Sequence, residues 1–374
     1  MESLAVTKCA MRHIMNKLHD FYRDRKVFIT GCTGFKGSWL ALWLLHLGAR
    51  VYGYSLPPLR AEDNFTLCNL GSHISHCDGD IRNVSALKKS IEESSADVVF
   101  HLAAQPLVLP SYQDPATTFA TNVMGTVNVL EACRTCREVR AAVIITTDKV
   151  YENKEWLYGY RECDRLGGID PYSASKACAE LAVRSYIHSF FSSSDAPAAA
   201  TARSGNVIGG GDWSEWRIVP DCMRALRKGE PIIVRKPNAV RPWQHVLDPL
   251  YGYLCLAAAL ISDRRKEIIG SWNFGPSHES MITVMNLVQR IIRRLGKGAY
   301  ETVVDSQAPH EASFLHLDIS KAVNLLGWSP LLDIEQAIEW TVQEYEEKID
   351  SSTEWFESRI RHIRHYMSMI NEKK

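Results

Sequence analysis

Short apolar runs alternate with longer stretches of helical apolar period through roughly the first half of the chain. An apolar run of strand length predicts a buried strand, and apolar positions three and four apart predict a helix. Repeated strand–helix units favour a parallel sheet that is covered by helices on both faces. Strands are expected at residues 26–30, 50–54, 74–77, 98–101, 143–146 and 199–202, and helices at 38–45, 85–94, 116–133 and 173–190.

The pattern changes after about residue 203. Residues 205–217 are rich in Gly, Trp and Asp, which is typical of a loop. Shorter strands and separate helices follow, and they predict a smaller mixed α/β lobe. Helices are expected at residues 219–228, 247–261, 284–295 and 334–349, short strands at 231–234 and 271–274, and a charged stretch of helical period at 352–374.

The charge balance and hydropathy exclude several classes of partner. Lys plus Arg and Asp plus Glu both number 43, so no overall field draws the protein to nucleic acid or to an anionic membrane. No apolar run approaches the roughly 20 residues that span a bilayer. Residues 1–25 have a basic, amphipathic helical pattern and no apolar stretch of signal-peptide length. We therefore expect no nucleic-acid or membrane partner, and a cytoplasmic location.

The ten cysteines follow no pairing pattern, which is typical of a reducing compartment. Cys133 and Cys136 form the only C-x-x-C, late in a predicted helix and without a second pair or a His cluster. Such cysteines usually pack as small apolar residues. We therefore predict no metal site.

A glycine-rich turn joins the first predicted strand to the first predicted helix. Its glycines have the spacing G-x-x-G-x-x-G, in which the first allows a tight turn, the second lets a pyrophosphate approach and the third lets the helix pack on the sheet. The free N–H groups of the helix start would then bind phosphate. This turn predicts a dinucleotide cofactor bound by Gly31, Thr33, Gly34, Phe35, Lys36 and Gly37.

Two further strand ends are candidates for the same cofactor. Asp80 and Ile81 follow the third strand, where they either reach an adenine or form a simple turn. Residues Leu102, Ala103 and Ala104 follow the fourth strand and would pass the middle of the cofactor. The second strand ends in Ser55 with Arg60 soon after, so neither an acid typical of NAD nor a certain arginine typical of NADP marks it.

These observations together predict the domain organisation. We expect an N-terminal extension at residues 1–25, a Rossmann-type NAD-binding domain at 26–203, a substrate lobe at 204–350 and a C-terminal tail at 351–374. The strand at 271–274 can return to the first domain, so the boundary is not sharp.

The candidate catalytic groups lie at the end of the fifth strand and at the start of the next helix. Tyr172 and Lys176 have the spacing Tyr-x-x-x-Lys, which puts a phenol and an ammonium on one helical face, where the ammonium lowers the pKa of the phenol. Thr147 ends the fifth strand, and Asp148 and Lys149 follow it as a second acid and base. The alternative for that pair is an exposed ion pair on a loop.

Several long motifs resemble the extended short-chain dehydrogenase/reductase superfamily, and within it the CDP-glucose 4,6-dehydratases. They are the turn at 33–39, the segment from Thr147 to Tyr172, the segment 203–213 with its run Gly209-Gly210-Gly211-Asp212-Trp213, and Arg241-Pro242-Trp243-Gln244-His245-Val246. The resemblance covers roughly residues 21–349. Related dTDP-glucose dehydratases have a glutamate where Lys149 stands, so Lys149 favours the CDP-glucose branch.

The resemblance implies NAD as cofactor and a dehydration without net redox change. Tyr172 would take the proton of the sugar 4-hydroxyl while hydride leaves C4, Lys149 would remove the C5 proton and Asp148 would protonate the departing 6-hydroxyl. Thr147 would bind near O4 and Lys176 would hold the nicotinamide ribose. By the same match, the substrate CDP-glucose would contact Gln105, Arg203, Asn206, Arg217, Arg241 and Trp243.

Three further expectations remain open. An arginine such as Arg217 or Arg241 can be a solvated surface residue, Trp243 can stack on the base or simply pack, and His101 is more typical of a packed strand histidine than of a catalyst.

The rival functions are another nucleotide-sugar 4,6-dehydratase or a 4-epimerase of the same fold, and a non-catalytic NAD-binding regulator. The superfamily also implies a homodimer through a four-helix bundle that includes the helices near residues 116–133 and 173–190.

Overall fold

The computed structural model describes residues 18–262, 265–303 and 313–372. Most of the expected N-terminal extension, residues 1–17, lies outside them. Residues 18–22 are helical, and Tyr22 donates a hydrogen bond to the Leu254 carbonyl at 2.9 Å. The end of the extension is therefore packed against the core of the protein.

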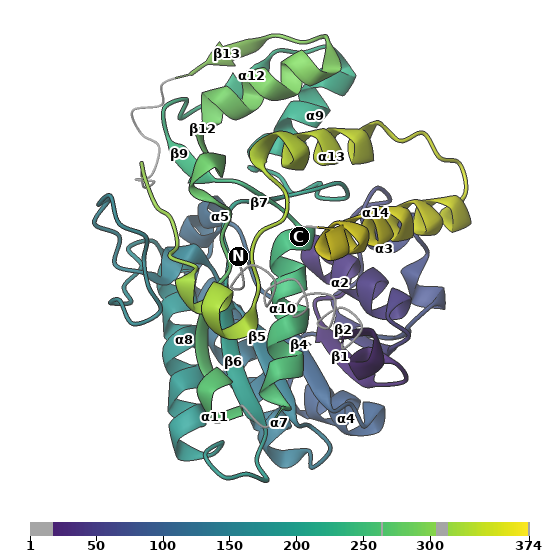
Figure 1. Cartoon of the computed structure of the whole chain (residues 1–374), viewed down its shortest axis with the longest axis vertical. Coiled ribbons are helices and arrows are strands. Elements are labelled where there is room, and N and C mark those ends of the chain that lie inside the picture. Colours follow the sequence, from purple (N-terminus) through teal and green to yellow (C-terminus); the bar gives the residue numbers. More distant parts are fainter. Residues whose placement is uncertain (1–17, 263–264, 304–312, 373–374) are drawn as a thin grey trace, which may run out of the picture.

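A seven-stranded parallel sheet forms the centre of the molecule, which confirms the predicted fold class (Figure 1). Its order is β11-β6-β5-β4-β1-β2-β3. Successive strands are added outward in one direction from β1 to β3 and in the other direction from β4 to β11, so the strand order reverses between β1 and β4. In such sheets ligands bind beyond the carboxyl ends of the strands at that point. The strands are β1 (Lys26–Thr30), β2 (Arg50–Ser55), β3 (Ser75–Asp78), β4 (Val98–His101), β5 (Ala141–Ile145), β6 (Ala198–Arg203) and β11 (Gly270–Asn273).

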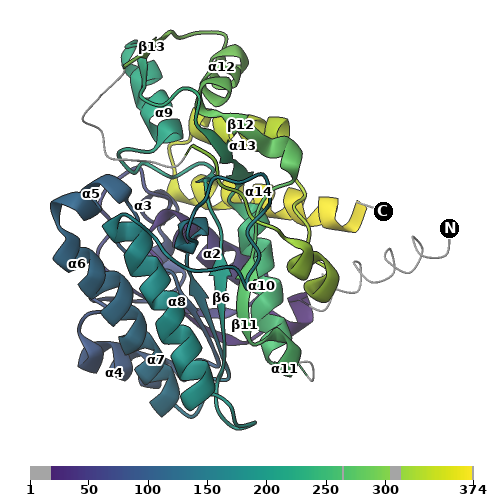
Figure 2. The same ribbon diagram turned by 90° about the vertical axis from the view of Figure 1, so that its left-hand side faces the viewer.

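Helices cover both faces of this sheet (Figure 2). On one face, α2 (Phe35–His46) and α10 (Leu247–Leu260) pack on the strands. On the other face lie α4 (Val84–Ser94), α7 (Gly125–Thr135) and α8 (Pro171–Ser189). Successive strand residues point to opposite faces, so two separate apolar cores form.

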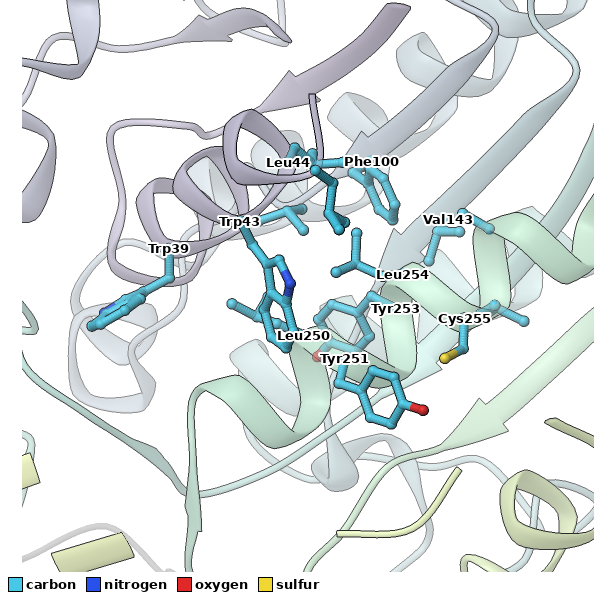
Figure 3. Close-up of a cluster of buried hydrophobic side chains, with 14 of the residues drawn as sticks. Trp39, Trp43, Leu44, Phe100, Val143, Leu250, Tyr251, Tyr253, Leu254 and Cys255 are labelled. Carbon is cyan, nitrogen blue, oxygen red and sulfur yellow. The ribbon is translucent and has the colours of Figure 1, made fainter. Parts of the chain in front are cut away.

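The larger core lies between α2 and α10. Figure 3 shows Trp43 of α2 beside Leu250 and Tyr251 of α10, with Phe100 of β4 and Val143 of β5 in the same cluster. These residues are almost fully buried. The long apolar run in α2 therefore reflects a helix that is covered on nearly all sides.

A smaller lobe with its own apolar core follows β6. Its helices pack with three two-stranded pairs, β7 with β10, β9 with β12, and β8 with β13. β11 lies in this part of the sequence but pairs with β6 in the large sheet. The elements are β7 (Val207–Ile208), α9 (Ile218–Lys228), β8 (Ile232–Val234), β9 (Val240–Pro242), β10 (Gln244–His245), β12 (Met281–Thr283), α12 (Val284–Leu295), β13 (Tyr300–Thr302) and α13 (Ile334–Glu346).

The last helix, α14 (Ser352–Glu372), packs on α2 and on the short helix α3 (Asn64–Leu67). Arg359 is buried, pairs with Glu347 at 2.8 Å and donates to the Asn64 side chain at 3.1 Å. Tyr366 donates to the buried Asp248 carboxylate at 2.7 Å. The charged C-terminal stretch thus carries buried polar contacts on one face. The remaining helices are α5 (Val108–Gln113), α6 (Pro115–Phe119) and α11 (Arg265–Ile268).

Candidate active site

A cavity of about 1040 Å³ lies between the carboxyl ends of the strands and the smaller lobe. Sites for one small molecule usually measure roughly 300–1,000 Å³, so this cavity lies at the upper end of that range. Its wall contains residues from the glycine turn, from the ends of β2 to β6 and from α9.

The glycine turn forms the floor of one end of the cavity. Gly31 has φ +75°, and a Cβ there would lie 2.6 Å from the Ala103 amide nitrogen, so only glycine fits. A Cβ on Gly37 would overlap the Gly31 carbonyl. The Thr30 hydroxyl accepts a hydrogen bond from the Ala103 amide at 3.3 Å, which ties the turn to the loop after β4. All the cofactor residues expected in the turn and in Leu102, Ala103 and Ala104 line the cavity.

The ends of β2 and β3 close the same end of the cavity. Asp80 and Ile81 line it, and Asp80 forms an ion pair with Arg82, whose hydrogen bonds lower the pKa of the Asp80 carboxyl. Ser55 and Arg60 lie in the same wall, with the Arg60 guanidinium 3.9 Å from Glu215. The Asp80 carboxylate is therefore engaged by its own turn.

Thr147, Asp148 and Lys149 occupy the end of β5 as expected from the sequence. The Thr147 hydroxyl donates to Asp148 Oδ1 at 2.9 Å, and Lys149 Nζ is 3.4 Å from the same oxygen. Asp148 is 1% exposed and lies behind the cavity wall under Gly205, where any Cβ would overlap its carboxylate. Asp148 Oδ2 is buried without a hydrogen-bond partner among the described residues. Because Lys149 lines the cavity, the pair is not a solvated surface ion pair.

Tyr172 and Lys176 enter the cavity from the first turns of α8. Asp170 caps this helix by accepting from the Ser173 amide at 2.9 Å. Lys176 Nζ donates to the Ile145 carbonyl at 3.2 Å, and burial lowers the pKa of Lys176 to about 8. Burial raises the pKa of Tyr172, whereas the Lys149 charge and a hydrogen bond with Thr147 lower it. The main cation acting on the phenol is thus Lys149, rather than Lys176 as the Tyr-x-x-x-Lys spacing predicted.

Five of the six expected substrate residues line the cavity: Gln105, Asn206, Arg217, Arg241 and Trp243. Arg217 pairs with Asp212 at 2.8 Å, and Asn206 has φ +48° with its Oδ1 buried and without a partner among the described residues. Gln105 donates to the Leu107 carbonyl and the Thr118 hydroxyl, so it also holds its own loop. Trp243 Nε1 donates to the Ile282 carbonyl.

Arg203 is the expected substrate residue that the structure places outside the cavity wall. Its guanidinium forms an ion pair with Glu180 at 2.8 Å, and it donates to the Tyr151 hydroxyl at 2.6 Å. Both charged side chains are almost fully buried. The position of Arg203 at a strand end suggested a contact with the ligand. Its side chain instead points toward α8, where the Glu180 carboxylate neutralises its charge. We therefore correct the expectation: Arg203 has a structural role.

Sequence reasoning missed the partner of this arginine. Glu180 lies one helical turn after Lys176 and also accepts hydrogen bonds from the Thr146 and Thr201 hydroxyls at 2.5 and 2.7 Å. An acidic residue at helical spacing from Tyr172 and Lys176 is the signal that would have indicated a buried partner for a strand-end arginine.

The other noted polar residues are packed in the interior. His101 contacts the Thr30 and Thr126 hydroxyls at 2.7 and 3.1 Å, and burial lowers its pKa to about 3, as fits a packed strand histidine. Cys133 of α7 and Cys136 directly after it lie in the core, and burial raises the pKa of Cys133 to about 12. None of the helices among the residues that the structure describes is long and apolar enough to cross a membrane.

Comparison with known proteins finds relatives over most of the chain. The chain is 45% identical over 315 residues to a CDP-glucose 4,6-dehydratase of Salmonella typhimurium, covering 83% of this chain and 88% of that protein. It is 28% identical to a dTDP-glucose 4,6-dehydratase of Xanthomonas campestris, covering 85% and 92%.

Among solved structures, a dTDP-glucose 4,6-dehydratase from Streptomyces venezuelae with bound NAD matches with a TM-score of 0.74 at 23% identity, covering 86% of this chain and 97% of that chain. A UDP-glucuronic acid 4-epimerase from Bacillus cereus, in complex with UDP-glucuronic acid and NAD, matches with a TM-score of 0.73 at 24% identity, covering 86% and 98%. These two likenesses concern the fold.

The family model described as GDP-mannose 4,6 dehydratase matches residues 28–341. That span contains the glycine turn, the Thr147–Lys149 segment and the start of α8. Since the model covers most of the sequence, and a curated dehydratase is nearly half identical, this chain belongs to the GDP-mannose 4,6-dehydratase family.

Proposed function

We propose that this protein is an NAD-dependent hydro-lyase that converts CDP-D-glucose to CDP-4-dehydro-6-deoxy-D-glucose and water. The observation that carries the proposal is the meeting of Asp148, Lys149 and Tyr172 at the end of β5. Hydride transfer alone needs one base, whereas elimination of water needs another base and an acid. The identity to the Salmonella CDP-glucose 4,6-dehydratase supports the choice of substrate.

The part of the cavity beside the glycine turn fits NAD. Gly31 packs closely on Ala103 and Gly37 on Gly31, which holds the backbone of the turn at the cavity wall, and a Cβ on Gly34 would meet only the Gly31 carbonyl, at 3.4 Å, so the pyrophosphate can approach there. When bound, NAD accepts the hydride from the sugar C4 and returns it to C6. We propose that residues 26–203 hold this cofactor, with Lys176 at the nicotinamide ribose, and that residues 204–350 hold the sugar nucleotide.

The first step is proton removal from the sugar 4-hydroxyl by Tyr172. The Lys149 charge and the Thr147 hydrogen bond both stabilise the phenolate, which offsets part of the cost of burying it. Thr147, at the end of β5, then holds the substrate near O4. The ketone formed at C4 makes the C5 proton acidic.

The second step is loss of water across C5 and C6. Once the ketone has formed, Lys149 passes its own proton to Asp148, whose Oδ1 lies 3.4 Å from Nζ. The neutral amine then removes the C5 proton, and Asp148 gives a proton to the departing 6-hydroxyl through the Thr147 hydroxyl, which lines the cavity; Lys149 later returns the C5 proton. Tyr172 has then gained one proton and Lys149 has lost one. The Thr147 hydroxyl donates a hydrogen bond to Asp148 and also forms a hydrogen bond with Tyr172. It therefore lies on a path by which the proton gained by Tyr172 can return.

A product assay tests the proposal. Purified protein with CDP-glucose should generate the alkali-induced absorbance of a 4-keto sugar, with one water lost by mass spectrometry. UDP-, dTDP- and GDP-glucose in parallel would show the base preference. An isomer of unchanged mass would instead indicate a 4-epimerase, and cofactor binding without turnover of any sugar nucleotide would indicate a regulator.

We also propose a homodimer in the cytoplasm. Large apolar side chains are exposed on helices α6 to α8, at Phe119, Met124 and Leu181, as a four-helix bundle with a second copy would require. The unpatterned cysteines support a reducing compartment.

The dimer predicts a specific change of mass in solution. By light scattering after gel filtration, the wild type should have twice the chain mass, and Leu181→Glu should shift it toward a monomer because it places a charge in the apolar contact. Val323→Glu is the control, since Val323 is similarly exposed but lies far along the chain, outside α6 to α8. A monomeric wild type would contradict the proposal.

A further inference from the structure

Lys36 begins in the glycine turn, but its side chain leaves that turn. Its Nζ donates a hydrogen bond to the Ser204 hydroxyl at 2.9 Å, and the Ser204 oxygen is 2.6 Å from the Tyr253 hydroxyl. Ser204 follows directly on β6, two residues before Asn206. Lys36 therefore reaches from the cofactor side of the cavity to the strand end that begins the smaller lobe.

The charges that act on Lys36 include those of Arg217 and Asp212, which lie on the substrate side. Burial, together with the charges of Arg217 and Lys176, lowers the pKa of Lys36 to about 7, against the opposing charges of Asp148 and Asp212. Arg217 is already paired with Asp212 at 2.8 Å. Lys36 and Arg217 both line the cavity. Two cations that repel each other in a partly buried site create a place for an anion.

We propose that Lys36 binds the diphosphate of the sugar nucleotide together with Arg217, and so acts as a substrate residue held on the cofactor turn. The inference rests on the proposed function only in taking a nucleoside diphosphate as ligand. A diphosphate between the two groups replaces their repulsion with two charge-assisted contacts. Ser204 and Tyr253 position the ammonium before the ligand arrives.

The proposal predicts in which direction the affinity for the diphosphate changes with pH. The free protein holds Lys36 with its pKa depressed to about 7, and a bound diphosphate raises that pKa because it favours the charged form. Between the two values the free protein has lost the proton and the complex holds it. Binding in this range takes up a proton, and the affinity for the diphosphate falls as the pH rises above about 7.

Calorimetry with CDP tests this directly. Titrations of the full chain at pH 8, in buffers of different ionisation enthalpy, should show net proton uptake for the wild type and none for Lys36→Met. At pH 7, Lys36→Met should bind CDP about ten- to a hundredfold more weakly, the range of one charge-assisted hydrogen bond. Lys36→Arg should keep affinity but lose the proton uptake, because a guanidinium stays charged. CMP should be affected less than CDP.

The affinity for NAD tests the alternative, in which Lys36 binds the cofactor. NAD affinity, followed by quenching of tryptophan fluorescence, should change less than threefold in Lys36→Met. Weaker NAD binding with unchanged CDP binding would overturn the proposal and return Lys36 to the cofactor. If Lys36→Met fails to fold, Lys36→Arg and Ser204→Ala carry the test: proton uptake that persists in Lys36→Arg equally overturns it.

Failure of the proposed function is distinguishable from failure of this inference. A diphosphate contact predicts the same relative loss for UDP, dTDP and GDP as for CDP. A different base preference would therefore revise the substrate and leave the role of Lys36 intact.

Discussion

Lys149→Met should lower the rate of water loss by about 10²- to 10⁴-fold, the usual contribution of a positioned general base. The first hydride transfer should survive, because it depends on Tyr172. Since the Lys149 charge lowers the pKa of Tyr172, that transfer should also require a higher pH than in the wild type. Rapid mixing with CDP-glucose should show reduced cofactor at 340 nm that persists, with no exchange of the C5 hydrogen for deuterium from solvent.

Two further variants are compared with Lys149→Met. Tyr172→Phe should prevent the absorbance change at 340 nm altogether, because the 4-hydroxyl keeps its proton. Lys154→Met removes a nearby lysine that is 56% exposed and paired with Glu152, and it should turn over normally. Dehydration at the wild-type rate in Lys149→Met would refute the role assigned to this residue.

Arg203→Met should lower the free energy of unfolding by about 3–5 kcal/mol, because it leaves the Glu180 carboxylate buried without its cation. Denaturant titration followed by circular dichroism measures this change. Replacing both residues, as Glu180→Leu with Arg203→Met, should restore part of the loss, since no unpaired charge then remains. Arg165→Met is the matched control, because Arg165 is 83% exposed and should change stability by less than about 0.5 kcal/mol.

The competing role for Arg203 gives a different pattern. If the guanidinium contacted the substrate, Arg203→Met would weaken CDP binding while the unfolding curve stayed in place. The cluster of Glu180, Tyr151 and Thr201 around the guanidinium argues for the stability effect.

Periodicity along the chain was enough to predict the sheet and its covering helices. The strands at residues 26–30 and 98–101 lie where the apolar runs placed them. Local spacing likewise predicted four side chains of the cavity wall, because Thr147 and Lys149 lie at one strand end and Tyr172 and Lys176 lie one helical turn apart. Such features depend on neighbours within one helical turn or at one strand end.

The misplaced or incomplete assignments depend on distant parts of the chain. The direction of Arg203 is decided by Glu180 on α8, and that of Lys36 by Ser204 beyond β6. The C-terminal stretch looked like a charged tail because its polar face dominates its composition. Its buried face is recognisable only once Asn64 and Asp248, far away in sequence, are in place.

Gly210 lies between two residues of the cavity wall, and groups from four elements converge around it. Its carbonyl accepts from Trp39 of α2 at 2.9 Å and from Asn64 of α3 at 3.3 Å, and its amide donates to Glu344 of α13. His362 of α14 contacts the same carboxylate at 2.9 Å. A recombinant fragment cut at the end of the matched family segment would lose Glu344 and the whole of α14. Shortened versions for crystallisation should therefore keep the chain through residue 372, and a fusion partner belongs after that helix.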